Sequence, residues 1–282
     1  MLVQPLPDLA AWSHDFQNRP IPVLQDTAQD LQLLADIEDR HGTVDAHLIE
    51  QAIGDDPLMT LQVLVHLSRH RPGRQITDVH TVTAAVVLMG IGPFFQTFAQ
   101  PVVLEDHLQA YPQAIEAVHR LLRRTWCGAR LVTEFALQHA DTHAGALQKA
   151  ALLHGHARLL LWCHAPALAL AVQEQCARHP HQDAASHELA LLHTTLDALE
   201  HRLARDWGLP GTLRRLTDPQ DSHSQVLLQP QRRLLALALA LAERIDCEGP
   251  QATLPPAELE ELSTLLGLSI PSVQRLIDNT LA

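Results

Sequence analysis

Residues 151–162 read ALLHGHARLLLW, an apolar run that contains His154 and His156. Its leucines and alanines predict a helix, which we expect to extend from residue 143 to residue 161 and to bury His154. No long stretch of the chain alternates apolar and polar residues as a half-buried strand does. The run therefore points to an all-α fold built from packed helices.

The composition agrees with a helical globular protein. Hydrophobic residues make up 46% of the 282 residues and aromatic residues only 4%, so leucine, alanine and valine must fill the core. The longest purely apolar run, Leu234 to Ala242, is far shorter than the roughly 20 residues of a membrane-spanning helix. No basic start followed by an apolar segment marks a signal peptide. We expect a cytoplasmic protein that binds no membrane.

Charge and cysteine content exclude further classes. The formal net charge of −12 disfavours binding to the phosphates of nucleic acids. The cysteines form no C-x-x-C pair, which argues against a zinc knuckle and against a disulfide framework. We expect the 19 histidines to lie mostly on solvated helix faces, although a metal-binding or pH-sensing role stays open. The cysteines are Cys127, Cys163, Cys176 and Cys247.

Start and stop signals predict 12 to 14 helices. Asp56 followed by Pro57 is the strongest signal, with the aspartate as N-cap and the proline in the first turn. We expect Thr43 to cap another helix, Gly92–Pro93 to turn the chain, and the proline-rich first twenty residues to be extended. The other expected helices include residues 27–38, 114–138, 166–178, 187–207, 229–246 and 256–267.

Two groups of histidines have spacings of chemical interest. His193, Asp197 and His201 share one face of the expected helix 187–207, and such a face could hold a divalent metal or simply be a solvated stripe. The HADTH sequence at residues 139–143 lies at an expected helix end beside a loop, where an imidazole interacts favourably with the helix dipole. The chain contains no H-E-x-x-H, no glycine-rich phosphate loop and no G-x-S-x-G.

A resemblance to a known family rests on segments that occur in a fixed order. They are RPIPVLQDTAQDLQLL from Arg19, IEQAIGDDPLMTLQVLVHLS from Ile49, TAAVVLMGIGPF from Thr83, RRTWCGARLVTEFA from Arg123 and LARDWGLPGTLRRL from Leu203. Together they resemble the HDOD domain, the HD-related output domain of bacterial signalling proteins. The resemblance covers residues 19–245. It implies an all-α bundle of two packed lobes at residues 19–112 and 113–282, after an extension of residues 1–18.

The resemblance also points to the positions that hold metal in HD hydrolases. Those enzymes use a histidine, a His-Asp doublet and a later aspartate. In this chain the first position falls at or near Gly128, the doublet on His154 and Gly155, and the last position near Glu243. Because a divalent metal needs three or four protein ligands, the resemblance implies a degenerate site without metal or other cofactor.

Other polar positions also depart from what the family would suggest. Residues 195–196 read Thr-Leu and residues 218–219 read Asp-Pro where we would expect a histidine, and Leu67–Ser68 stands where Asn-Ser is common. The Trp207–Pro210 segment is expected to be structural, because a helix end followed by Gly-Leu-Pro is typical of a C-cap.

The resemblance implies a non-catalytic signal-transduction module of bacteria. It would bind a signalling protein in trans or a second copy of itself, and no nucleic acid. Two alternatives remain: a nucleotide-binding sensor that uses the former substrate cavity, and a residual metal-dependent phosphohydrolase built from His154, His156, Glu243 and nearby carboxylates.

Overall fold

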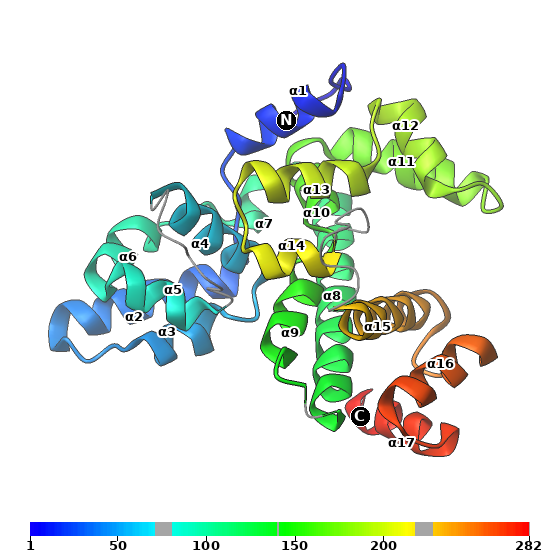
Figure 1. The fold of residues 1–282 in the computed structure, drawn as a ribbon. Helices are drawn as coiled ribbons and strands as arrows, with labels where there is room; N and C mark the ends of the chain where they lie inside the picture. Colours follow the sequence, from blue (N-terminus) through cyan, green and yellow to red (C-terminus); the bar gives the residue numbers. More distant parts are fainter. Residues whose placement is uncertain (71–80, 140, 218–227, 282) are drawn as a thin grey trace. The chain divides into compact units, whose positions relative to one another are not determined.

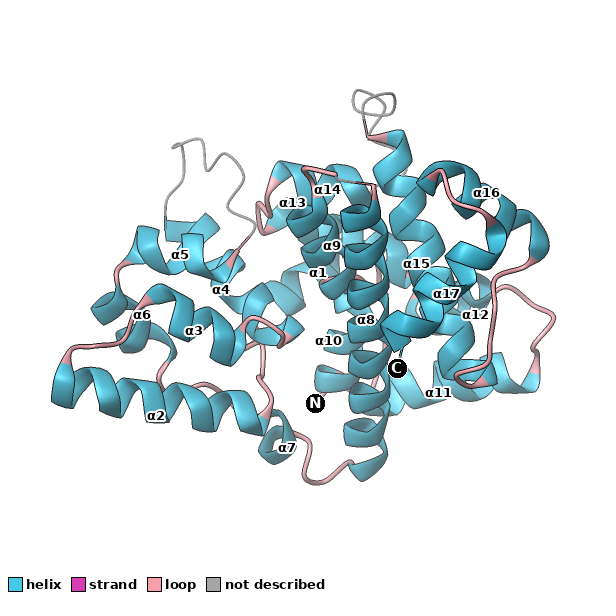
Figure 2. Cartoon of the chain, turned by 90° about the horizontal axis from the view of Figure 1, so that it is seen from below, coloured by secondary structure: helices cyan, strands magenta, loops and turns pink. Residues whose placement is uncertain are grey.

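The computed structural model describes residues 1–70, 81–139, 141–217 and 228–281. This part of the chain is helical and contains no strand beyond an isolated parallel bridge between Val23 and Val103, so the expected all-α class is confirmed (Figure 2). The helices are more numerous than expected. They are α1 (Leu9–Gln17), α2 (Gln25–His41), α3 (Ala46–Ile53), α4 (Pro57–His70), α5 (Val82–Met89), α6 (Ile91–Phe98), α7 (Leu104–His107), α8 (Pro112–Gln138), α9 (Ala144–Leu152), α10 (His156–His164), α11 (Pro166–Arg178), α12 (Ala184–Leu192), α13 (Leu196–Asp206), α14 (Gly211–Thr217), α15 (Gln229–Glu248), α16 (Pro256–Leu266) and α17 (Ile270–Leu281).

Contacts between residues divide the chain into two compact units. Unit 1 comprises Met1–His119 and Gly155–Leu209, and unit 2 comprises Arg120–His154 and Pro210–Ala282. The chain passes between the units inside α8, at the peptide bond after His154, and again after Leu209. The lobes expected at residues 19–112 and 113–282 stay a prediction. No helix in the described ranges has both the length and the hydropathy needed to cross a bilayer.

A buried carboxylate fixes the start of α4, as the Asp-Pro step predicted. Asp56 is 4% exposed, and its Oδ1 accepts hydrogen bonds from the backbone N–H groups of Leu58 and Met59 at 2.8 and 3.1 Å. Its Oδ2 accepts a third from Leu24 N–H at 3.1 Å. Burial raises the pKa of the Asp56 carboxyl, whereas these hydrogen bonds act in the opposite direction. One side chain therefore joins the beginnings of α2 and α4.

Helices α2 to α6 surround one apolar core in unit 1 (Figure 1). Helix α3 packs against α2 and α5, and α5 also packs against α4 and α6. Asp45 is the N-cap of α3, and its Oδ1 accepts a hydrogen bond from Leu48 N–H, so the expectation that Thr43 caps this helix is wrong. Gly92–Pro93 lies inside the first turn of α6 and does not turn the chain away, because proline fits the start of a helix.

The first twenty residues are not extended throughout, because α1 spans Leu9–Gln17. Asp8 caps α1 by accepting a hydrogen bond from Ala11 N–H, and Trp12 and Phe16 follow at helical spacing, each 1% exposed. The Trp12 indole N–H donates to the Leu192 carbonyl at 2.8 Å. Helix α1 packs against α13, so the N-terminal segment belongs to the core of unit 1.

Two expected long helices are each broken in two. The expected helix 143–161 forms α9 and α10, separated at Gly155, whose φ of +78° lies in the left-handed region that only glycine adopts without strain. The expected helix 187–207 forms α12 and α13, separated at His193 with φ +60°. The carbonyl of Leu6 lies 3.0 Å from His193 Nδ1, so the N-terminal segment holds this break in place.

Unit 2 is built around the second part of α8 and α15. Helix α15 packs against α9, α14 and α16, and α16 packs against α17. The loop between α8 and α9 is held by Asp141, which accepts hydrogen bonds from His143 N–H and from the Gln231 amide, both at 2.8 Å. The HADTH segment therefore lies at a helix end, as expected, and Asp141 serves as its anchor. Its residue 140 lies outside the described ranges.

Candidate functional site

Gly128 serves helix packing in unit 2. It is buried on α8, and a Cβ atom built on it would lie 3.1 Å from the Leu239 Cδ2 atom and 3.6 Å from the Ala242 Cβ atom of α15. The first of these distances is already tighter than ordinary van der Waals contact. A histidine here would have to displace Leu239, so this position holds α8 and α15 close together and offers no ligand.

Glu243 is engaged by a cation. Its Oε1 atom lies 3.1 Å from Arg124 Nη1 on α8, and the Glu243 side chain is 64% exposed. One turn further along, Arg120 pairs with Asp246 at 2.9 Å. These pairs join α8 to α15 on their solvent side. A guanidinium beside the carboxylate repels a divalent metal, so Glu243 is a poor substitute for the aspartate of HD hydrolases.

The histidine of the doublet is not buried. His154 is exposed and lies in the turn between the end of α9 at Leu152 and the start of α10 at His156. The expectation of a buried His154 is wrong, and the buried histidine of the stretch is His156, at 4% exposure. Nothing lies within 4 Å of a Cβ atom built on Gly155, so a side chain would have space there. Glycine is favoured at this position because its φ lies in the left-handed region.

A buried acid in unit 1 organises the residues after this turn. Glu200 on α13 is 8% exposed and accepts a hydrogen bond from Gly155 N–H at 3.1 Å. Its Oε2 atom lies 3.8 Å from His156 Nδ1. The His156 ring also faces the Trp207 ring, with 5.8 Å between centroids. Glu200 therefore joins the start of α10 to α13, and His156 is part of this packing.

These positions do not fit a divalent metal. Two of these positions, Gly128 and Gly155, have no side chain, and the Glu243 carboxylate is paired with Arg124. His154 is the one histidine among the four positions. In the described part of the chain, no three His, Cys, Asp or Glu residues lie close enough together to hold a metal.

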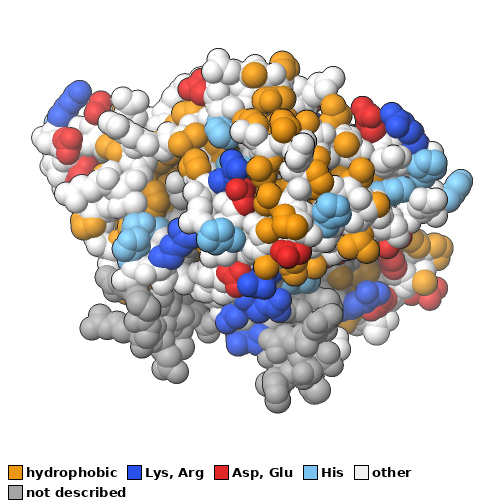
Figure 3. All heavy atoms as spheres, turned by 90° about the horizontal axis from the view of Figure 1, so that it is seen from above, with side chains coloured by type: hydrophobic (Ala, Val, Ile, Leu, Met, Phe, Trp, Pro, Cys, Tyr) orange, Lys and Arg blue, Asp and Glu red, His pale blue; other side chains and the backbone are white. Residues whose placement is uncertain are grey.

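The proposed stripe of His193, Asp197 and His201 does not exist. His193 is the C-cap of α12 and only the other two belong to α13, so the three residues do not share one helix face. On the face drawn in Figure 3, histidine side chains are spread out and not gathered into one patch. The break in the predicted helix removes the only helical metal geometry that the sequence suggested.

The turn after α13 has the C-cap geometry that the Gly-Leu-Pro sequence predicted. Trp207 is 2% exposed and is the C-cap of α13. Gly208 has φ +63°, and Leu209 N–H donates to the Ala204 carbonyl at 3.0 Å, which is the bond that closes a left-handed helix end. Thr195, where a histidine might have been expected, caps the same helix through Ala198 N–H. The other such position, residues 218–219, lies outside the described ranges.

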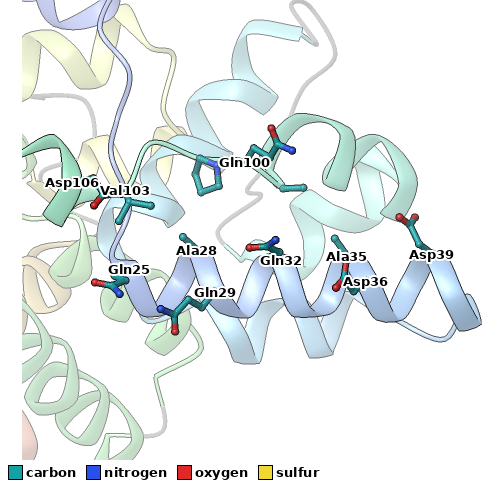
Figure 4. Close-up of a pocket in the computed structure, with 12 residues that line it drawn as sticks. Gln25, Ala28, Gln29, Gln32, Ala35, Asp36, Asp39, Gln100, Val103 and Asp106 are labelled. Atoms are coloured by element: carbon teal, nitrogen blue, oxygen red, sulfur yellow. The ribbon is translucent and has the colours of Figure 1, made fainter.

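A groove in unit 1 is a second candidate site, which the sequence had not indicated. It encloses about 590 Å³ between α2 and the chain around residues 99–106. Figure 4 shows its residues on α2 following the helix, with Gln100, Val103 and Asp106 on the other side. We call this site the α2 groove. It is lined by Gln25, Ala28, Gln29, Gln32, Ala35, Asp36, Asp39, Ala99, Gln100, Pro101, Val103 and Asp106.

Comparison with known proteins assigns the fold to a family. The HDOD domain model matches residues 21–223, which is more than half of the chain. A response regulator, MmoQ from Methylococcus capsulatus, has a similar structure with a TM-score of 0.67 at 21% identity, covering 92% of this chain and 98% of that one. A virulence factor from Campylobacter jejuni has a TM-score of 0.61 at 14% identity, covering 98% of both chains. No curated protein matches this chain in sequence.

Proposed function

Because the chain belongs to the HDOD family, we propose that it is a non-catalytic signal-transduction module of bacteria that acts by binding another protein. One observation carries the proposal. The positions that we equate with the metal ligands of HD hydrolases serve other ends: Gly128 packs against Leu239, Glu243 pairs with Arg124, and His154 faces solvent. The similar structure described as a response regulator supports a role in signalling.

The chemistry of phosphoester hydrolysis explains why this observation matters. A metal-dependent phosphohydrolase needs a metal held by several oriented ligands, which activates water and neutralises the charge that develops on the phosphate. A single exposed histidine and a carboxylate beside an arginine supply neither function. We infer that the helical scaffold of the hydrolases is kept in this protein for recognition. Its partner is a signalling protein on a separate chain or a second copy of this chain, in the cytoplasm.

Interaction with a defined partner tests this function. Cross-linking in the native organism, followed by mass spectrometry, should identify one signalling protein or this chain itself. The purified pair should then form a complex of defined stoichiometry in analytical ultracentrifugation. A nucleotide that raises the unfolding free energy by about 2.7 kcal/mol, as a ligand at 100 times its dissociation constant does, would instead favour a small-molecule sensor.

A further inference from the structure

We propose that the α2 groove is where the partner docks, and that its occupant is an extended peptide segment with two cationic side chains about six residues apart. The inference rests on the proposed function and names the chemistry of the partner. The groove is polar and acidic, and it differs from the apolar grooves that receive amphipathic helices.

The shape of the groove suits an extended chain. The residues that α2 contributes recur at intervals of three and four, so they form one continuous stripe along the helix (Figure 4). Ala28, Ala35 and Ala99 line the groove with small side chains, which leave space that larger side chains would fill. From Gln25 to Asp39 the helix rises about 21 Å at about 1.5 Å per residue. An extended peptide covers that length with about six residues.

The middle of the groove offers hydrogen bonds that any peptide backbone can use. Gln29, Gln32 and Gln100 line it, and each side-chain amide has both donor and acceptor groups. No hydrogen bond joins these side-chain amides to another residue in the described ranges. A peptide backbone also presents donors and acceptors in alternation, so these amides can hold it whatever its side chains are.

The ends of the groove supply the charge. Asp36 and Asp39 lie at one end and Asp106 at the other, and no lysine, arginine or histidine lines the groove. The nearby cation Arg40 reaches Asp36 only at 3.8 Å, with both side chains more than half exposed. Such an ion pair at the surface is weak, so a cationic side chain of the ligand can take the place of Arg40 beside Asp36. Acidic ends around a neutral middle therefore select two separated positive charges.

A pair of labelled nine-residue peptides tests the proposal on the full chain by fluorescence anisotropy. The first has arginines at its second and eighth positions, with serine, alanine and valine elsewhere, and the second has its arginines at the fourth and sixth positions. We expect the first to bind at least about tenfold more tightly, and the Asp36→Asn/Asp39→Asn variant to lose at least about tenfold of that affinity. Asp106→Asn should weaken binding as well.

The matched control is Asp26→Asn/Asp30→Asn. These aspartates also lie on α2, but they do not line the groove. Because the control too replaces two aspartates by asparagines, it changes the net charge by the same amount. It should leave the affinity within about twofold, far below the tenfold effect that corresponds to about 1.4 kcal/mol. The proposal would be overturned if both double variants lost the same affinity for the first peptide, or if the wild type did not bind that peptide. It would also be overturned if spermidine displaced the two peptides equally well.

The failure of this inference can be told apart from failure of the proposed function. If the Asp36→Asn/Asp39→Asn variant still binds the partner identified by cross-linking with unchanged affinity, the α2 groove is not the docking site and the interaction module stands. If the wild-type chain binds no partner at all, the proposed function itself is wrong.

Discussion

The Ser68 hydroxyl donates a hydrogen bond to the Gly208 carbonyl at 3.0 Å, across 140 residues of sequence. It joins the end of α4 to the left-handed turn after α13 within unit 1. A Cβ atom on Gly208 would lie 2.5 Å from the Ser68 Oγ atom, so the two residues are matched in size as well as in hydrogen bonding.

This contact predicts a non-additive pair of substitutions. Ser68→Ala should lower the free energy of unfolding by about 1 kcal/mol, the usual net value of one hydrogen bond. Gly208→Ala should cost about 2 kcal/mol or more, because it adds left-handed strain and a clash with Ser68. In the double variant the clash is gone, so urea denaturation should show a loss at least about 0.5 kcal/mol smaller than the sum. Strict additivity would show that the two side chains do not meet.

Trp207→Ala should destabilise the protein strongly. The indole is 2% exposed, and removing a buried tryptophan leaves a cavity that costs about 3 to 5 kcal/mol. Leu189→Ala is the control, because Leu189 is 56% exposed and its loss should change stability by less than about 0.5 kcal/mol. A Trp207→Ala protein with unchanged melting temperature but no affinity for the partner would make this tryptophan a binding residue.

His164 should make the protein less stable in acid. Burial, with a smaller effect of His107 and Arg19, lowers the pKa of His164 to about 3. The unfolded chain therefore takes up a proton at this residue near pH 6.5 that the folded chain refuses until about pH 3. The contribution of His164 to the free energy of unfolding is therefore fully present above pH 6.5. Below that pH it falls by up to about 1.4 kcal/mol per pH unit.

His164→Gln removes this titration. The difference in unfolding free energy between wild type and variant, measured in urea at pH 7, 6, 5 and 4, should change steadily in favour of the variant as pH falls. Parallel curves for the two proteins would mean that the imidazole is solvated in the folded state.

Gly155→Asp should not recreate a metal site. The new side chain would have space, but the backbone there has φ +78°, which costs an L-residue about 1 to 2 kcal/mol. The Gly155 N–H donates to the Glu200 carboxylate, so the added carboxylate would also stand near another negative charge. We expect a lower melting temperature and no increase in bound manganese. Gly155→Ala, which carries the strain without the charge, separates the two causes.

The sequence predicted most helices where capping chemistry is local. Asp56 and Pro57 specify the start of α4 with their own side chains, and the prolines that open α11 and α16 did the same. Helix α1 was missed because the prolines around it suggested an extended segment. Its signal was present in Asp8 as N-cap and in the aromatic pair Trp12 and Phe16, four residues apart.

The breaks and the candidate sites were harder to predict, because they depend on distant partners. Apolar periodicity continues across Gly155, and only the dihedral of that residue shows that α9 stops before it. The break at His193 depends on Leu6, far away in sequence. In the same way, the polar stripe on α2 looks like an ordinary solvated face until the chain around Gln100 is placed opposite it.

The central claim is that the hydrolase scaffold persists here without its metal chemistry. The most direct test is metal analysis of the purified wild-type chain after equilibration with manganese, together with phosphodiesterase and nucleotidase assays on the same sample. We predict that the protein binds no stoichiometric metal and hydrolyses the substrates no faster than buffer alone. The reason is that Gly128 and Gly155 offer no ligand and Glu243 is paired with Arg124. A metal-to-protein ratio near one or two together with metal-dependent turnover would contradict the account.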